Sequence, residues 1–558
     1  MRKNSVDQCA DRRVVGSSGI EVRRDGEVLA RPPRLRRCFV TPKAAMGSTG
    51  MSNRRQSIAF VGCAGGYASR GGPQRRLRPA SRSKDHAIAL DRPAVRATDA
   101  SQRWWVLAAV VAAQFMFVVD AFIVNVALPT IAVDLRASAA QIQAIIAVNL
   151  IGYATLVITG GRLGDIYGAK RVFVLGVLGF TLASLWCGLA RSGPELIIAR
   201  LAQGATAALM VPQVLATIHV LFSDAARGRA FAIYGVVLGL GGAAGFLAGG
   251  ALVWLDVAGL GWRSVFFVNV PIGLAIAAAA LGLMPHVPRR AGVQLDVVGA
   301  GMLFAGLLCL VGPLLFGREF HWGPWVWTTM LLGVGIVVGF LRLERAVAQN
   351  GGLPLVDLTL LSDRAFVRGL VAAFCFFFAN LSFYLIITLF LQNGLGLNPL
   401  GASYVVLPLA LAFVVAARQS AARVTKVGLK VLTDGCALQL AGLAGTVALV
   451  TVVEKPSLWL LILPLAVFGY GQGLVMAPLS GAVLSSVAKS NAGSASGLYG
   501  TVQQIANAVG VAVVGALFFA LNAASSERIA LSVSFALLAA AILTCAAFVA
   551  RMRRTRTA

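Results

Sequence analysis

The chain has 558 residues, of which 58% are hydrophobic and only 13% are charged, and its mean hydropathy is +0.79. Because a soluble domain carries roughly 25% charged residues, this composition excludes an ordinary soluble protein and indicates a polytopic membrane protein. The net charge of +27 would fit nucleic-acid binding in a soluble chain, but basic membrane loops explain most of it, so we expect no nucleic-acid partner.

The first 103 residues differ from the rest of the chain. They hold 22 Lys and Arg against 8 Asp and Glu, are rich in Arg, Gly, Ser and Pro, and show no sustained periodicity, which is typical of disorder. They also lack the apolar core of a cleavable signal peptide. Two interpretations stay open: a tail without function, with Met46 or Met51 as a later start, or a basic arm that contacts anionic lipid.

Fourteen apolar stretches follow, each close to the roughly 20 residues that cross a bilayer as a helix. The connections between them are mostly short and leave no room for a soluble domain. The sequence therefore predicts an all-α polytopic membrane protein with 14 transmembrane helices. The expected helices are 104–128, 141–161, 171–190, 194–220, 229–253, 264–285, 295–317, 325–344, 367–391, 401–420, 428–452, 457–485, 497–520 and 530–550.

The positions of Lys and Arg support this helix count independently. If the N-terminus is cytoplasmic, the inner connections hold sixteen of these residues and the outer connections hold six. Cytoplasmic loops carry such an excess, so both termini are expected in the cytoplasm, with 551–558 as a basic tail. We expect a multi-pass protein of the inner (plasma) membrane.

Two charged residues stand inside apolar stretches: Asp120 in FMFVVDAFIVNVALP (115–129) and Arg200 in LIIARLAQGATAALMVP (196–212). A charge in the hydrocarbon core is costly, so such residues usually face polar surroundings and carry function. If the outer helix ends lie at Pro129 and Pro194, Asp120 is roughly 13 Å deep and Arg200 roughly 9 Å deep, which predicts a pair. The alternative is that Arg200 snorkels to the nearby surface.

A glycine-rich connection, GGRLGDIYGAKRV (160–172), joins the second and third helices. Its glycines allow a tight turn and close helix approach, and its acid has basic partners nearby. The alternative is an ordinary charged loop. The residues singled out are Gly161, Gly164, Asp165, Gly168, Lys170 and Arg171.

The fifth helix carries GGAAGFLAGG (241–250), in which Gly241, Gly245, Gly249 and Gly250 recur at helical spacing. Small residues at this spacing let helices pack backbone to backbone. The motif therefore predicts a close helix contact, either as a specialised element or as ordinary packing.

Polar residues on several helices could line a substrate cavity, although packing or lipid-facing positions are the alternative for most of them. These residues are Gln203, Asn380, Tyr384, Tyr470, Gln472 and Met476. Asp434 is a candidate second acid, or an interfacial residue at the cytoplasmic end of its helix. The cysteines and histidines are scattered, and no HExxH, GxSxG or Walker motif occurs, so we expect no metal site, no enzyme and no ATP-driven pump.

These motifs resemble the signatures of the major facilitator superfamily. The connection 160–172 is similar to GxLaDxxGxkxxl, and RLAQG (200–204) is similar to RxxqG. VDAFIVNVALP (119–129) looks like lDxTivNvALP of the fourteen-helix drug:proton antiporters, with Phe122 in place of threonine. GGAAGFLAGG resembles gxxxGPxxGG, with Phe246 in place of proline.

Three further stretches are similar to the same branch: 261–273, 492–515 and 421–430, the last as a worn copy of the first glycine-rich connection without its Asp. The resemblance covers residues 104–550 and identifies the EmrB/QacA-like branch. It implies two six-helix bundles, 104–285 and 366–550, with a two-helix insert and linkers at 286–365.

The resemblance also implies a function. In this family the glycine-rich loop is a gating latch, the arginine corresponding to Arg200 takes part in proton transfer, and amphipathic, often cationic drugs leave the cell in exchange for protons. Near Asp120, the basic partner favours the carboxylate and burial favours the acid, which suits a proton carrier. The implied partners are a lipophilic small molecule, protons and the lipid bilayer, the protein acting as a monomer, with no cofactor beyond the proton gradient.

Other functions stay open on sequence alone. A transporter of this kind could export one endogenous metabolite instead of many drugs. A proton-coupled importer would share the fold, but we would not expect the first- and fifth-helix signatures in it. A membrane sensor without transport would have little need of both Asp120 and Arg200.

Overall fold

The computed structural model describes residues 100–222, 224–285, 295–352, 354–453, 457–487 and 492–557. The extension 1–99, and with it the choice between a tail without function and a lipid-binding arm, lies outside these residues. The described residues form helices and no strand, and fourteen of the helices are long and apolar enough to cross a membrane. The predicted all-α, fourteen-helix class is confirmed.

The first group of helices contains the two predicted charged residues. Its members are α1 (Ala100–Asp134), α2 (Ala139–Tyr167), α3 (Ala169–Leu189), α4 (Gly193–Leu221), α5 (Asp224–Leu255), α6 (Ser264–Phe267) and α7 (Asn269–Leu283). Two 3-10 turns, η1 (Val257–Gly259) and η2 (Gly261–Arg263), precede α6. Helix α4 packs between α2 and α3, and α1 packs on α5 and α7.

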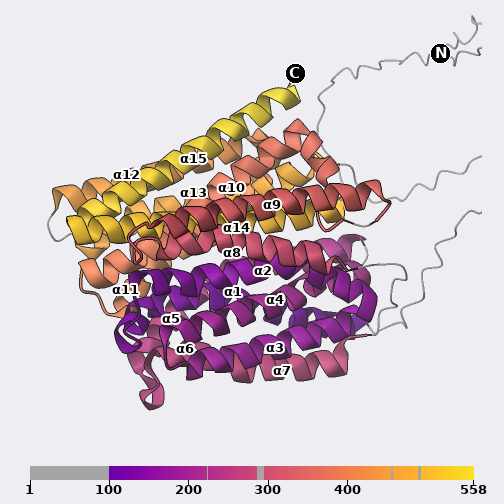
Figure 1. Cartoon of the computed structure of the whole chain (residues 1–558), viewed down its shortest axis with the longest axis horizontal. Coiled ribbons are helices and arrows are strands. Elements are labelled where there is room, and N and C mark those ends of the chain that lie inside the picture. The colour runs from indigo at the N-terminus through magenta and orange to yellow at the C-terminus, as the bar shows by residue number, and fades with distance from the viewer. Residues whose placement is uncertain are drawn as a thin grey trace, which may run out of the picture. The chain divides into compact units, whose positions relative to one another are not determined.

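A hairpin of α8 (Val297–Phe316) and α9 (Pro324–Gln349) follows, and α8 packs against α2 and α14. Figure 1 draws this hairpin between the first group and the helices that follow. The last group packs through the pairs α11 with α13, α12 with α13, and α10 with α14 and α15. Its elements are η3 (Leu358–Ser362), α10 (Arg364–Leu389), the π-helical η4 (Phe390–Gly394), α11 (Pro399–Val427), α12 (Lys430–Val452), α13 (Leu458–Leu484), α14 (Ala492–Ala524) and α15 (Glu527–Thr557). The division into two six-helix bundles and an insert stays a prediction.

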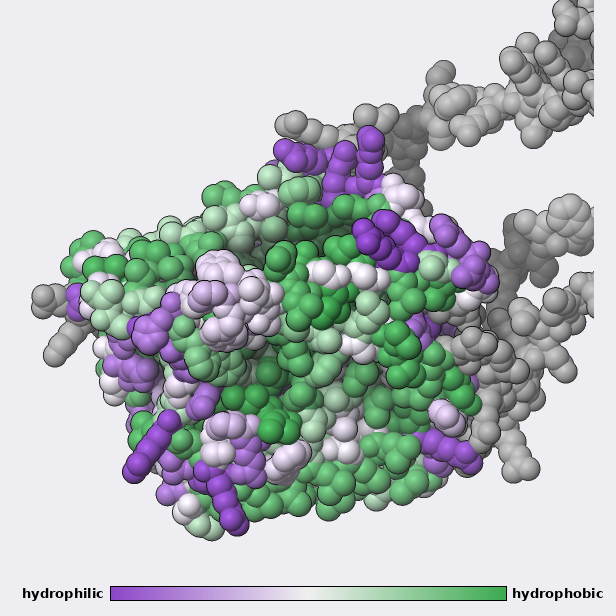
Figure 2. Space-filling view, in the orientation of Figure 1, coloured by the Kyte–Doolittle hydropathy of each residue, from purple (hydrophilic) through white to green (hydrophobic). Residues whose placement is uncertain are grey.

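The distribution of apolar side chains on the surface fits a membrane protein. Figure 2 shows hydrophobic residues over the middle of one face and hydrophilic residues gathered toward its two ends. Large exposed apolar side chains occur on many helices, among them Leu175, Leu182 and Leu281. Such exposure would favour aggregation in water, but in lipid it matches the surrounding hydrocarbon.

Several helices are longer than the sequence predicts. Helix α1 continues past Pro129 to Asp134, because a proline inside a membrane helix is tolerated where neighbouring helices and local adjustment satisfy the freed backbone. Helix α2 continues to Tyr167, so most of the predicted glycine-rich loop is helical. The chain breaks only at Gly168, whose φ of 93° is in the region that favours glycine.

Glycines bring α2 and α4 into backbone contact. A Cβ on Gly160 would collide with the carbonyl oxygen of Ala208, and a Cβ on Gly204 would collide with that of Asn149. Gln213 adds a hydrogen bond from its Nε2 to the Gly160 carbonyl at 2.8 Å. This close packing fixes the position of α4, and so of Arg200, against α2.

Helices α5 and α11 meet along only part of their length. A Cβ on Gly250 would stand 2.8 Å from the Pro399 carbonyl, and Ser403 donates from Oγ to the Phe246 carbonyl at 2.8 Å. Toward the beginning of α5, the space beside Gly235 and Gly228 is open. A Cβ on Gly239 would meet Val414 of α11 at 3.3 Å, so the two helices touch from the C-terminal end of α5 back to its middle, and no described neighbour lies beside the glycines nearer its N-terminal end.

Candidate functional site

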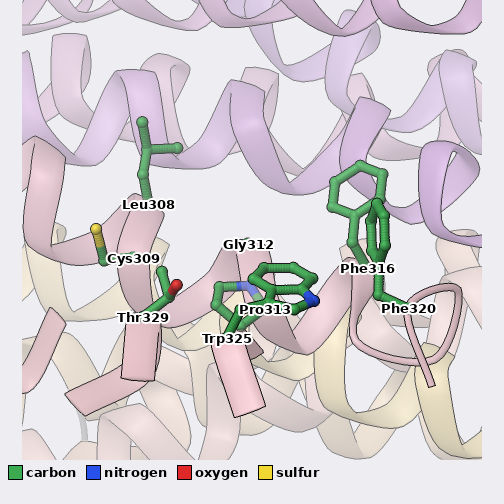
Figure 3. Close-up of a pocket in the computed structure, with 8 residues that line it drawn as sticks. All are labelled: Leu308, Cys309, Gly312, Pro313, Phe316, Phe320, Trp325 and Thr329. Atoms are coloured by element: carbon green, nitrogen blue, oxygen red, sulfur yellow. The ribbon is translucent and has the colours of Figure 1, made fainter. Parts of the chain in front are cut away.

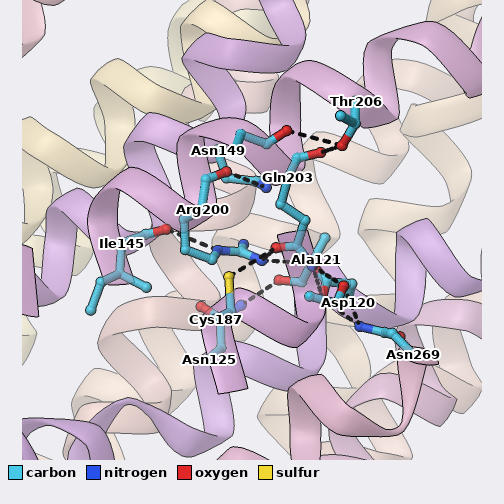
Figure 4. A network of polar contacts seen from close by, with 12 residues as sticks. Asp120, Ala121, Asn125, Ile145, Asn149, Cys187, Arg200, Gln203, Thr206 and Asn269 are labelled. Carbon is cyan, nitrogen blue, oxygen red and sulfur yellow. Dashed lines mark hydrogen bonds and ion pairs between the residues drawn. The ribbon is translucent and has the colours of Figure 1, made fainter. Parts of the chain in front are cut away.

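Asp120, on α1, is a buried carboxylate that accepts hydrogen bonds from three side chains. Arg200 Nη1 lies 2.6 Å from Oδ2, and Oδ1 accepts from Gln203 Nε2 and Asn269 Nδ2, each at 2.9 Å. Asp120 is 1% exposed. Donors on α4 and α7 thus satisfy both oxygens, which is the arrangement an ionised buried carboxylate requires. Figure 4 shows these contacts converging on Asp120.

Arg200, on α4, has other acceptors besides Asp120. Its Nε donates to the Ile145 carbonyl of α2 at 3.2 Å, and its Nη1 also donates to Gln203 Oε1. The guanidinium lies 5.9 Å from the ring centroid of Phe266. Arg200 is only 2% exposed, so it does not snorkel to the surface. Its charge is held inside the helix group by acceptors that would remain if Asp120 became neutral.

The surroundings of this pair are closed and mainly neutral. Ser184 Oγ accepts from Gln203 Nε2 at 2.7 Å, and Cys187 Sγ lies 3.9 Å from Gln203 Oε1, both from α3. Ser184, Cys187 and Gln203 have no exposed surface. Electrostatic interactions are strong in such a site because little water is present to screen them.

Local structure explains how α4 presents Arg200. Ser192 caps the helix by accepting from the Glu195 amide, and Pro194 occupies a first-turn position where no amide hydrogen is needed. Two turns later, Asn149 of α2 donates from Nδ2 to the Arg200 carbonyl at 3.2 Å. These contacts fix the start of α4 and its register against α2. The side chain of Arg200 is therefore directed toward Asp120.

The sequence predicted Asp120 and Arg200 as a pair, and the two are in direct contact. Gln203, predicted as a cavity residue, belongs to the same network. Sequence reasoning missed Ser184 and Asn269. Asn269 lies in the signature stretch 261–273, where an amide between apolar neighbours was the available signal, whereas nothing distinguished Ser184.

The predicted gating residues fall at the junction of α2 and α3. A Cβ on Gly164 would collide with the Gln213 amide group, whereas Gly161 has only an ordinary contact with Pro212. Lys170 Nζ donates to the Leu281 carbonyl of α7 at 2.7 Å. Arg171 is exposed and Asp165 is half-buried. Their gating role stays a prediction.

Arg162, which follows Gly161 directly, was not among the predicted site residues. Its guanidinium donates to the carbonyl of Pro354, in the segment that leads to α10. It therefore ties the end of α2 to the beginning of the last helix group.

The four glycines of α5 pack against two different helices. A Cβ on Gly241 would meet Val118 at 2.8 Å, and Gly245 and Gly249 lie equally close to the backbone of α1. Gly250 instead faces α11. The motif thus allows close approach of α5 to α1 on one side and to α11 on the other.

The two positions that depart from the antiporter signatures contact each other. The rings of Phe122 and Phe246 have centroids 5.7 Å apart, and each lies 5.2 Å from Tyr384 of α10. Tyr384 donates from its hydroxyl to Gln472 Oε1 of α13 at 2.8 Å. We call Phe122, Phe246 and Tyr384 the aromatic trio; it joins α1 and α5 to the last helix group. Gln392 adds a hydrogen bond to the Val126 carbonyl at 3.0 Å.

The remaining candidates lie apart from the polar network. Tyr470 donates to Gln419 of α11, Met476 is half-buried among apolar side chains, and Asn380 is half-buried. Asp434 is exposed near the beginning of α12. Of the predicted cavity residues that do not belong to the Asp120 network, the described structure brings only Tyr384 and Gln472 into contact.

An apolar pocket of about 320 Å³ lies on the α8–α9 hairpin. Figure 3 shows the rings of Phe316, Phe320 and Trp325 beside it. Its lining is almost entirely apolar. It contains none of the residues predicted to couple protons or to bind substrate. No group of three His, Cys, Asp or Glu that could hold a metal occurs among the described residues.

Comparison with known proteins adds a family and relatives. The family model described as Major Facilitator Superfamily matches residues 110–511. The probable actinorhodin transporter of Streptomyces coelicolor is 38% identical, over 75% of this chain and 73% of that protein. The puromycin resistance protein pur8 of Streptomyces alboniger is 35% identical, over 77% and 84%. The crystal structure of the POT family transporter PepTSo aligns with a TM-score of 0.59 at 13% identity, over 81% of this chain and 98% of that one, which is a likeness of fold.

Proposed function

The chain belongs to the major facilitator superfamily, and from that premise we propose that it exports amphipathic, often cationic drugs or antibiotics across the plasma membrane in exchange for protons. It is a multi-pass membrane transporter and not an enzyme. Relatives named for antibiotic transport or resistance support the export of such compounds. The proton coupling rests on Asp120.

The observation that carries the coupling is the bonding of Asp120. As a carboxylate it accepts from Arg200, Gln203 and Asn269, so a proton on it would face three donors. Protonation would therefore break at least one of these contacts. Arg200 keeps acceptors at Gln203 and Ile145, which lowers the penalty of separation from Asp120. The site can thus exist in two bonded arrangements, one for each protonation state.

Helix α1 connects the proton site to the contact between the two helix groups, because it carries both Asp120 and Phe122. Asp120 faces α4 and α7, whereas Phe122, two residues later, contacts Phe246 of its own helix group and Tyr384 of the last group. A movement of α1 that follows protonation would disturb the aromatic trio. With a cytoplasmic N-terminus, the trio and the contact of Gly250 with α11 lie toward the outer side, so the described conformation would be closed outside.

Transport would follow from differential affinity. If drug and proton each favour a different conformation, each biases the equilibrium between inward and outward access, and a proton gradient can drive drug movement. The conformation closed outside would release the proton to the cytoplasm and admit drug there. After the change, drug would leave and Asp120 would take a proton from outside.

Transport in everted vesicles tests this function. With an acidified lumen and a pH-sensitive dye, addition of substrate should release protons from the lumen, and expression should lower drug susceptibility in a host without its own pumps. An exporter of a single endogenous metabolite would release protons only with that compound. Movement of substrate out of the everted vesicles together with protons would indicate an importer, and no coupled movement would indicate a sensor.

A further inference from the structure

A second buried acidic site lies far along the chain from Asp120, at the hairpin of α8 and α9. Asp296 is the residue that caps α8, and Glu344 lies in the last turns of α9. Glu344 has no exposed surface. We call Asp296 and Glu344 the acid pair. Neither residue figures in the proposed transport mechanism.

One oxygen of each carboxyl group is satisfied by the backbone. Asp296 Oδ1 accepts from the Gly299 amide at 2.7 Å, and Glu344 Oε2 accepts from the Val356 amide at 2.8 Å. The Val356 bond attaches α9 to the segment that leads to α10. Each acid therefore has a structural role through one oxygen only.

The other two oxygens, Asp296 Oδ2 and Glu344 Oε1, are buried and have no hydrogen-bond donor among the described residues. Both face the same point. A Cβ on Gly299 would stand 2.5 Å from Asp296 Oδ2 and 2.7 Å from Glu344 Oε1, and the two carboxyl groups lie within hydrogen-bonding reach. Two acceptors without a donor, side by side and away from water, form an unfavourable arrangement if both are ionised.

Among the residues that the structure describes, few charges oppose the acid pair. Arg162 of α2 lies within electrostatic reach of both acids while donating to the Pro354 carbonyl. The described sequences of α8 and α14 contain no charged residue, and Arg342 and Arg345 of α9 are exposed.

The acids of the neighbouring segment are occupied elsewhere, because Asp357 accepts from the Thr359 amide and Asp363 from the Ala365 amide. Within the described part of the chain, two ionised acids beside one arginine would leave a net negative charge. One added proton removes it.

We propose that Asp296 and Glu344 bind one proton between them. The proton forms an O–H bond to one carboxyl group, and that group donates to the remaining carboxylate oxygen. Both unpartnered oxygens are then satisfied, and no other bond forms or breaks. Two carboxyl groups at close range share a proton for the same reason in other buried pairs, because like charges at that distance repel.

The shared proton makes the attachment of the hairpin depend on pH. With the proton bound, the acid pair and Arg162 balance in charge, and α8, α9, α2 and the segment before α10 are held together. Loss of the proton leaves a buried negative charge at this junction. Because the end of α2 also carries Gly161, Gly164 and Asp165 of the predicted gating residues, the pair would sense the pH on the side of the membrane where α2 ends.

Thermal unfolding of the full chain in lipid nanodiscs tests this proposal without measuring transport. The proton-bound form belongs to the folded protein, so its contribution is present at low pH and is lost as pH rises. Between about pH 5 and about pH 8, the melting temperature of the wild type should fall relative to Glu344→Gln. The glutamine amide donates to Asp296 as the proton would, at every pH. Glu319→Gln, an exposed acid on the same hairpin, should melt like the wild type.

Infrared spectroscopy supplies a second measurement that does not depend on stability. The wild type should show the carbonyl band of a buried protonated carboxylic acid, and Asp296→Asn and Glu344→Gln should each lose it. The band should remain in Asp120→Asn, which separates this site from the proposed coupling site. A wild type without that band, as expected if a water bridges two carboxylates, would overturn the proposal. So would a Glu344→Gln variant with the wild-type pH dependence, or stabilisation by Na⁺ over an organic cation at constant pH and ionic strength.

Discussion

Arg200 contributes a positive charge and a planar set of hydrogen-bond donors. Two substitutions separate these contributions: alanine removes both, and lysine keeps only the charge. Arg200→Ala would leave Asp120 ionised and buried with only neutral donors, and breaking a buried pair in this way costs about 3–5 kcal/mol. We expect no proton-coupled transport from Arg200→Ala. Arg200→Lys should be weak at best, because one ammonium cannot reach Asp120, Gln203 and the Ile145 carbonyl as the guanidinium does.

The measurement is the initial rate of pH-driven transport, normalised to folded protein from size-exclusion chromatography. Arg318→Ala, at an exposed position, is the control and should transport normally. An Arg200→Lys variant at the wild-type rate would show that only the charge matters.

Asn269 donates to the same oxygen of Asp120 as Gln203. Asn269→Ala removes one bond to the carboxylate, and a hydrogen bond to a charged group contributes about 1.5–3 kcal/mol. The protonated acid becomes relatively more favourable, so proton release requires a higher pH. We expect the pH profile of transport to move toward higher pH, with Asn350→Ala, at an exposed helix end, as control. A profile moved toward lower pH would contradict this role for Asn269.

At the scale of single residues, the sequence predicts charges better than neutral polar groups. Asp120 and Arg200 were predictable because charges are rare in apolar stretches. Ser184 was not, because one serine in a membrane helix is common and its neighbours depend on the rotation of α3. The snorkelling alternative for Arg200 could be excluded only when its burial and partners were known.

The contact of α5 with α11 offers a test at the scale of helices. A side chain on Gly250 would meet the Pro399 carbonyl and Ser403 in the described conformation. Gly250→Val should therefore hinder closure at this end and reduce transport severalfold without loss of protein. Gly235→Val makes the same change on the same helix, where the space is open, and should have little effect. The measurement is the transport rate of each variant divided by its expression level. Equal rates in the two variants would show that transport does not require the contact of α5 with α11.

Helix boundaries were the least predictable features at this scale. Pro129 suggested the end of α1, but the helix continues to Asp134, and the glycine-rich connection is mostly part of α2. The end of a membrane helix depends on what surrounds it, and the residues alone do not specify that. The contact between the two signature departures, Phe122 and Phe246, was equally hidden, because it depends on how α1 and α5 pack.

At the scale of the whole molecule, composition and basic-residue positions predicted the fourteen helices, since each reflects the bilayer directly. The alternation of Lys and Arg could be counted without any structure. The junction of the α8–α9 hairpin with Arg162 and Pro354 was not predictable, because it joins residues far apart in the chain.

Removal of residues 1–100 tests the two interpretations of the N-terminal extension. No predicted helix or motif begins before α1, so we expect membrane insertion and transport to be nearly unchanged. Quantitative blotting and transport rates in the same vesicles provide the comparison. Lost activity at an unchanged protein level would instead support a basic arm with a role, such as contact with anionic lipid.

Asp120→Asn tests the central claim most directly. The amide keeps the shape and the capacity for hydrogen bonds but cannot carry a proton. In everted vesicles, we expect exchange of drug for drug, which needs no net proton movement, to persist in Asp120→Asn, while accumulation of drug driven by an acidic lumen disappears. Asp120→Glu should retain part of the driven transport. If Asp120→Asn accumulates drug in response to the pH gradient at the wild-type rate, Asp120 does not carry the proton and the mechanism proposed here is wrong.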